Sequence, residues 1–219
     1  MARSSFFLLT LAVCLYGQIS KVPYATASDG SGPTFSARDI SILLGGHYRS
    51  IRDVDFPNLT VPMLGGAGKR IGTAQFKNGR YQIDGLMDHF SEEFEAFHPV
   101  PSASRAEFAL ALYSWTEVAG SSSQGSKALL FAVDKAHLRV VQSIDWDTHF
   151  NGGSPTDSFD AATNTLVIRS AHYIPGDAHC CVSAVDVVAF RWNGIRFVET
   201  SIRTELSEYG KAEGKTLPN

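Results

Sequence analysis

Two adjacent cysteines carry the most reactive chemistry in this chain. Cys180 and Cys181 follow the run Gly176-Asp177-Ala178-His179, and the third cysteine, Cys14, lies in an apolar N-terminal stretch. In an oxidising compartment a pair of thiols tends to form a disulfide. Consecutive Cα atoms lie ~3.8 Å apart across a trans peptide, which is shorter than the ~4.4–6.8 Å usual for a disulfide. A bond between Cys180 and Cys181 therefore needs a strained turn, and strain makes a disulfide easier to reduce.

Three states of this cysteine pair follow from its position. A vicinal disulfide that stiffens a loop between two strands is the interpretation we favour. The same bond could instead form a redox-responsive or ligand-gripping turn. If the segment were a strand, the two side chains would point to opposite faces and remain free or pair with other chains.

Histidines and carboxylates near the cysteines raise the question of a metal site. His172, Asp177 and His179 join the two cysteines within ten residues, and these ligand types suit zinc or copper. Their spacing matches no zinc-ribbon pattern, and an oxidised pair loses its thiolates. A polar loop with hydrogen-bonded histidines is the simpler interpretation.

A second group of polar side chains comprises Asp145, Asp147 and His149. In an extended segment these three side chains share one face, where they could bind a metal or act as an acid–base group. They directly precede the run Asn151-Gly152-Gly153, and acidic residues beside Asn and Gly are typical of turns. We therefore expect turn formation here, and the sequence assigns no catalytic residue, no metal and no cofactor.

The segments that must position these residues are mostly strands. The hairpin signals are Asn78-Gly79 between 73–76 and 81–83, a turn at 134–136 between 128–133 and 137–144, and a pair 165–173 and 185–192 that encloses the cysteines. Short strands joined by local turns favour a mostly β (α+β) fold, with an antiparallel sheet or sandwich and one or two short helices. The helix signals are a capped segment over 36–44 and an amphipathic one over 88–97, with Phe90, Phe94 and Phe97 at helical spacing.

The N-terminus has the pattern of a secretory signal peptide. Arg3 precedes an apolar run from Phe6 to Leu15, and Ala25-Thr26-Ala27 supplies small residues for cleavage. The run is shorter than the roughly 20 apolar residues that a membrane-spanning helix needs. Attachment of a lipid at Cys14 is the less favoured alternative, because Val13 stands where a small residue is expected. The predicted organisation is a signal peptide over 1–27, a flexible leader over 28–34, one β domain over 35–203 and a flexible tail over 204–219.

Charge restricts the partners of the exported chain. The formal net charge is −3, and it becomes −5 once the two basic residues of the signal are removed. Nucleic acids and anionic membrane surfaces attract proteins with a basic patch. We therefore expect neither as a partner.

Several motifs, in a common order, resemble those of a family of uncharacterised secreted bacterial proteins. The run 54–62 is similar to the family's Asp-Phe-x-Asn-Phe-Thr-Tyr-Pro opening, and 76–81 resembles its Leu-x-Asn-Gly-x-Tyr hairpin. Cys180-Cys181-Val182-Ser183 resembles a Cys-Cys-Pro-Ser/Thr motif that is shared with envelope lipoproteins of the LppP/LprE type. The run 190–197 resembles a Tyr-Arg-Trp-Asn-Gly-x-x-Phe strand. The resemblance implies a secreted β protein and carries over no activity.

Two departures from the family's pattern limit what the resemblance implies. Val182 replaces the proline of the cysteine motif. The family's acidic loop corresponds here to residues 98–107, where only Glu107 remains as a ligand, and hard cations need six or more oxygens. We therefore expect no calcium site.

The function expected from these observations is that of an exported, non-catalytic binding or structural module, periplasmic or extracellular. Its expected partners are envelope proteins or a small ligand. The alternative is a periplasmic thiol–disulfide or metal-dependent factor centred on His179-Cys180-Cys181.

Overall fold

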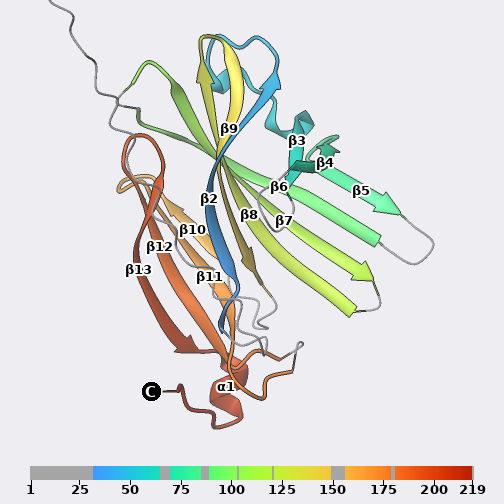
Figure 1. The fold of residues 1–219 in the computed structure, drawn as a ribbon, viewed down its shortest axis with the longest axis vertical. Coiled ribbons are helices and arrows are strands. Elements are labelled where there is room, and N and C mark those ends of the chain that lie inside the picture. The colour runs from blue at the N-terminus through green and yellow to red at the C-terminus, as the bar shows by residue number, and fades with distance from the viewer. Residues whose placement is uncertain are drawn as a thin grey trace, which may run out of the picture.

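The computed structural model describes residues 32–64, 70–84, 89–102, 104–119, 121–148, 156–178 and 181–218 (Figure 1). Their elements, in chain order, are β1 (Gly32–Pro33), β2 (Phe35–Gly45), the 3-10 turns η1 (Ile51–Asp53) and η2 (Phe56–Asn58), β3 (Thr60–Leu64), β4 (Arg70–Gln75), β5 (Arg80–Asp84), β6 (His89–Val100), β7 (Glu107–Ala119), β8 (Ser121–Asp134), β9 (His137–Asp147), β10 (Asp157–Asp160), β11 (Thr165–Tyr173), β12 (Ala184–Trp192), β13 (Phe197–Leu206) and α1 (Glu208–Ala212). The predicted signal peptide and most of the predicted leader lie outside the described residues.

Antiparallel pairing organises these strands into two main sheets. One sheet has six strands in the order β2-β9-β8-β7-β6-β5. The other has the order β1-β11-β12-β13, with β10 also paired to β11, and β3 and β4 form a small separate sheet. The prediction of a mostly β, antiparallel fold with a short helix is confirmed.

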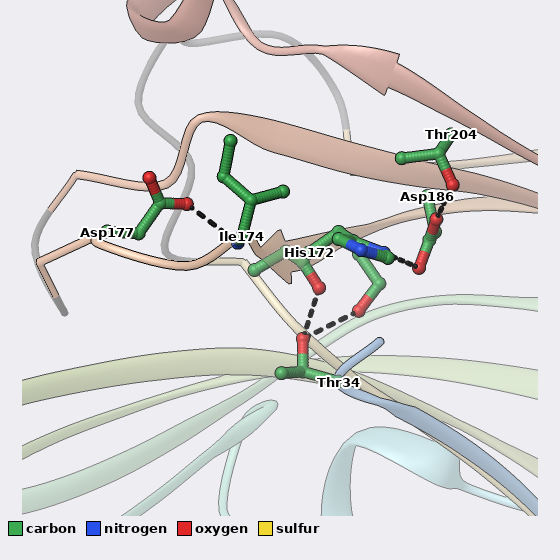
Figure 2. Close-up of polar contacts among 8 residues, drawn as sticks. Thr34, His172, Ile174, Asp177, Asp186 and Thr204 are labelled. Atoms are coloured by element: carbon green, nitrogen blue, oxygen red, sulfur yellow. Dashed lines mark hydrogen bonds and ion pairs between the residues drawn. The ribbon is translucent and has the colours of Figure 1, made fainter. Parts of the chain in front are cut away.

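The chain passes from one main sheet to the other at Thr34, between β1 and β2. The Thr34 backbone N–H donates to the carbonyl of Ala171 on β11 at 3.3 Å, and its carbonyl accepts from Asp147 N–H on β9 at 3.1 Å. Its hydroxyl donates to the same Ala171 carbonyl at 2.5 Å. One short segment therefore joins the two sheets by hydrogen bonds at this corner. Figure 2 shows the contacts of the Thr34 hydroxyl.

Apolar side chains cover both faces of the six-stranded sheet. Between the two main sheets, residues such as Leu110, Leu130 and Ile144 pack with Ile168 and Phe190 of the smaller sheet. The opposite face forms a second apolar layer with η1, η2, β3 and β4, including Phe56, Phe76, Tyr113 and Phe131. The central strands β7 and β8 are buried on both sides at their centres, which explains their long apolar runs.

Both segments that the sequence predicts as helices are strands. In β2, burial alternates through Ile40, Ile42 and Leu44, while Leu43 stays 55% exposed. The period of two therefore replaces the helical spacing that Ile40, Leu43 and Leu44 suggest.

A bulge explains why β6 resembles a helix in sequence. The pairing of β6 with β7 shifts register between Phe94 and Ala96, so Glu95 is the extra residue. Phe94 and Phe97, three residues apart, consequently lie on the same face and both stack on Phe56, at 6.3 and 5.0 Å between ring centroids. The bulge thus gives a strand the spacing of a helix face.

Two of the three predicted hairpins form, and the third forms only its turn. Pairing of β8 with β9 and of β11 with β12 confirms two of the predicted hairpins. At Asn78-Gly79 a tight turn forms, with φ of 52° and 81°, but only Lys77 and Arg80 pair across it. Beyond the turn, β4 pairs with β3 and β5 pairs with β6, so the two strands join different sheets.

The C-terminal segment is more ordered than the predicted flexible tail over 204–219. Residues Thr204 to Leu206 belong to β13, and α1 follows directly. Ser207 caps α1, because its side chain accepts from Gly210 N–H at 2.9 Å. Since both Ser207 and Gly210 are buried, the ordered β domain extends past its predicted end at residue 203.

Candidate functional site

The cysteine loop, residues 174–183, connects β11 to β12 at one end of the smaller sheet. The carboxylate of Asp177 accepts hydrogen bonds from both ends of this loop. Oδ2 accepts from the backbone N–H of Ile174 at 3.0 Å (Figure 2). The same oxygen accepts from the Ser183 backbone N–H at 2.9 Å, and Oδ1 accepts from the Ser183 hydroxyl. The loop therefore has a defined base that does not depend on its cysteines.

The charge state of Asp177 matches this arrangement. Burial raises the pKa of Asp177, but the hydrogen bonds from Ser183 and Ile174 and the positive charge of Lys215 outweigh burial, so the pKa is below its ordinary value. Hydrogen bonds to the charged form stabilise a carboxylate against protonation. Asp177 is therefore an ionised structural acceptor at neutral pH.

Ala178 and Cys181 contact each other near the tip of the loop. Cys181 N–H donates to the Ala178 carbonyl at 2.9 Å, and the two residues form an isolated antiparallel bridge. Cys181 is disulfide-bonded. The other two cysteines of the chain, Cys14 and Cys180, lie outside the described residues, as does His179, so the vicinal pairing stays a prediction.

The C-terminal helix packs against the base of the same loop. Ser207 N–H donates to the Ser183 carbonyl at 2.9 Å, and the Ser207 hydroxyl donates to the Val182 carbonyl at 2.6 Å. A Cβ placed on Gly210 would lie 2.1 Å from the Ser183 carbonyl oxygen, so only glycine allows this approach. Ser207 and the start of α1 thus hold residues 182–183, where the cysteine loop leads into β12.

Beside the loop, three side chains form a hydrogen-bonded row across β11, β12 and β13. His172 Nδ1 lies 2.8 Å from Asp186 Oδ2, and Thr204 donates its hydroxyl to Asp186 Oδ1 at 2.6 Å (Figure 2). Asp186 is 1% exposed and the His172 side chain 21% exposed. Asp186 pairs directly with Ser170 and Thr204 in the sheet, which places all of these groups on one face.

A buried carboxylate on one imidazole nitrogen orients the ring and is a common arrangement in catalytic and metal sites. Such a site also needs a nucleophile or further ligands at the other nitrogen. Among the described residues, none forms a hydrogen bond with His172 Nε2, and no group of three or more His, Cys, Asp or Glu is arranged to hold a metal. Within that part of the chain, the row is a structural hydrogen-bond network with one partly exposed imidazole.

The predicted metal candidates lie in separate environments. Asp177 holds the loop backbone, while His172 pairs with Asp186. His149 and His179 lie outside the described residues.

Asp145 and Asp147 lie within β9, although the sequence favours a turn for this run. Asp145 Oδ2 accepts from the Ser143 hydroxyl at 2.8 Å, and burial raises its pKa against the opposing effects of Ser143, Lys127 and Arg38. Asp147 interacts with Tyr173, whose pKa is raised by burial and by the Asp147 carboxylate. The two carboxylates therefore have different partners.

Sequence reasoning missed several buried polar residues. Asp186 is the only acidic residue in the apolar run 184–190, a signal that could have been recognised. Glu92 and Lys127 form an ion pair with 2.5 Å between Nζ and Oε1, and their side chains are 11% exposed for Lys127 and 1% for Glu92. Because the sequence predicts a helix over 88–97, it does not indicate that Glu92 is buried. The partner of Glu92, Lys127, lies on β8, so no local sequence pattern predicts this ion pair.

Comparison with known proteins finds no family model, no curated protein and no solved structure that matches this chain. In the described part of the chain, no helix combines the length and apolar character needed to cross a membrane.

Proposed function

We propose that this protein is an exported, non-catalytic binding module, periplasmic or extracellular, that presents the cysteine loop to its partner. The observation that carries the proposal is the Asp177 clamp, with three hydrogen bonds that fix both ends of a loop at the end of a sheet. A loop that is ordered before binding loses less conformational entropy when a partner binds. Loops on a rigid β scaffold commonly serve recognition in this way.

A vicinal disulfide between Cys180 and Cys181 belongs to this proposal. Cys181 is disulfide-bonded, and export with cleavage after Ala27 would remove Cys14 with the signal peptide. Cys180 would then be the only other cysteine of the mature chain. Such a bond would order the tip of the loop, as Asp177 orders its base.

The environment of the candidate catalytic groups supports recognition over catalysis. Asp186 is occupied on both oxygens, by His172 and Thr204, and Asp177 is occupied by the loop. These carboxylates serve as internal acceptors that hold strands and a loop together.

The test starts with a panel of hydrolase substrates and a panel of ligands: sugars, amino acids, dipeptides and peptidoglycan fragments. We expect no turnover above the rate without protein, and we expect any ligand that raises the melting temperature to bind less tightly to Asp177→Ala. The matched control is Asp160→Ala, which removes a carboxylate acceptor with two partners from the exposed turn between β10 and β11. Turnover that disappears in His172→Gln would overturn the proposal.

Export and the disulfide are tested by intact mass of the exported protein, with and without alkylation under non-reducing conditions. We expect a chain that begins at Ser28, carries no lipid and takes up no alkyl group. A retained N-terminus, a lipid on Cys14 or two alkylated cysteines would each contradict the corresponding part of the proposal.

The alternative function is that of a periplasmic thiol–disulfide factor. It is favoured by the partial exposure of the disulfide-bonded Cys181. Catalytic disulfides titrate reversibly at potentials near those of their compartment, whereas structural ones resist reduction. Titration with glutathione buffers distinguishes the two, and we expect the bond to remain oxidised.

A further inference from the structure

A buried ion pair connects two strands that are not neighbours in the six-stranded sheet. Lys127 Nζ on β8 lies 2.5 Å from Glu92 Oε1 on β6, and β7 runs between these strands. The Lys127 side chain passes over Tyr113 of β7, with Nζ 5.5 Å from the centre of its ring. The pair thus spans β7 on the face that carries the second apolar layer.

Buried aromatic side chains of the second apolar layer lie beside this pair. Tyr113 is 0% exposed, and its ring lies 5.2 Å from Phe76 and 5.7 Å from Phe94 between centroids. Among the described residues its hydroxyl has no hydrogen-bond partner. Burial and the charge of Glu92 raise the pKa of Tyr113, so this hydroxyl stays protonated and is available as a donor.

Such an environment disfavours the charged form of Glu92. Burial raises the pKa of Glu92, and Lys127 lowers it only in part. Transfer of one proton from the ammonium to the carboxylate across the 2.5 Å contact would give a neutral amine beside a neutral carboxylic acid. The amine is a nucleophile, and the acid carbon lies one bond away from the oxygen that Nζ already contacts.

We propose that Lys127 and Glu92 condense into an intramolecular amide, which covalently joins β8 to β6. The lone pair of Nζ attacks Cδ of the protonated Glu92, the Nζ–Cδ bond forms and the Cδ–OH bond breaks. The second Nζ proton leaves with that hydroxyl as one water molecule. No electrons are exchanged and no further reagent is consumed.

Among the side chains that the structure describes, Asp145 is a second carboxyl group that faces Lys127, since the two residues pair directly between β8 and β9. Its Oδ2 instead accepts from the Ser143 hydroxyl at 2.8 Å, whereas Nζ of Lys127 contacts Glu92. The geometry therefore assigns the bond to Glu92. Like a disulfide, the amide would restrict the unfolded chain, but it would not respond to reduction.

The experiment compares the purified, folded protein with Lys127→Arg after both are denatured, reduced and alkylated. Arginine keeps the charge beside Glu92 but does not form the amide. We expect wild type to be lighter by one water than the mass of its sequence with alkylated cysteines, and Lys127→Arg to have the full mass of its own alkylated sequence. Peptide mapping should find one branched species that contains both Lys127 and Glu92.

A second variant identifies the reacting carboxyl group. In Glu92→Gln the same amide forms with loss of ammonia instead of water, so a deficit of one ammonia supports the proposal. Full sequence mass in wild type overturns it, as does a water loss that persists in Lys127→Arg or in Glu92→Gln. A branched peptide joined through Asp145 also overturns the Lys127–Glu92 assignment. In that case Asp145→Asn would release ammonia instead of water.

Discussion

Replacement of Asp177 by alanine tests the argument that one carboxylate holds the cysteine loop. The change leaves the backbone N–H groups of Ile174 and Ser183 and the Ser183 hydroxyl without their acceptor. A buried donor left unpaired costs ~1–3 kcal/mol, and water reduces that cost at a partly exposed site. We expect a local loss of about 1–2 kcal/mol, which corresponds to roughly tenfold faster amide exchange.

Hydrogen–deuterium exchange of peptides that cover 171–187 measures this effect at neutral pH. Asp177→Asn should lie between wild type and alanine, because it keeps an oxygen acceptor and loses the charge. The control is Asp160→Ala, in the turn between β10 and β11, where Asp160 accepts from Ala162 N–H at 2.8 Å and from the Thr163 hydroxyl at 2.7 Å. Unchanged exchange in Asp177→Ala, or equally fast exchange of the cysteine loop in Asp160→Ala, would refute the clamp.

The same clamp predicts a pH dependence with a definite sign. The pKa of Asp177 in the folded loop is below its ordinary value of 3.8, so the opened loop binds more protons in that range. The contribution of Asp177 is fully present at neutral pH and is lost as the pH falls below 3.8 through the lowered folded pKa. After correction for intrinsic exchange, wild type and Asp177→Ala should converge under acid conditions. A difference that persists there would contradict the charge-based explanation.

Three further substitutions test how other parts of the fold are held together. In Gly210→Ala the new Cβ would lie 2.1 Å from the Ser183 carbonyl oxygen, so α1 should detach, seen as faster exchange over 207–214. Gln142→Ala removes two hydrogen bonds, at 2.8 and 2.9 Å, to the buried backbone of Phe197, and urea unfolding should show a loss of about 2–4 kcal/mol. Phe56→Ala empties a site that is 0% exposed, with an expected loss of about 3–5 kcal/mol by the same assay. Losses below 1 kcal/mol would contradict the last two.

Much of the β architecture could be predicted from local patterns. Alternating apolar residues and turn signals indicated the β8–β9 and β11–β12 hairpins, because strand pairing across a short turn depends on residues close in sequence. The Asn78-Gly79 turn was likewise predicted. Its flanking strands separate into different sheets, and that outcome depends on where β3 and β6 offer free edges.

The two false helices show where local patterns fail. A helix over 36–44 and one over 88–97 both rest on apolar spacings of three and four. In β6 the bulge at Glu95 produces that spacing in a strand, and a bulge is stabilised by the neighbouring strand β7. Short apolar segments are ambiguous between the two periods until their partners are known.

The amino-acid sequence was sufficient to recognise the β class and the cysteine loop between two strands, because each depends on residues adjacent in the chain. The secretory signal is likewise predicted from adjacent residues. Tertiary structure was needed to pair His172 with Asp186, Lys127 with Glu92 and Ser207 with Ser183. These contacts join residues on different strands or on a strand and a helix, and no local propensity encodes them. Sheet order and register decide which polar groups meet. Both follow from the burial of the two faces of the six-stranded sheet.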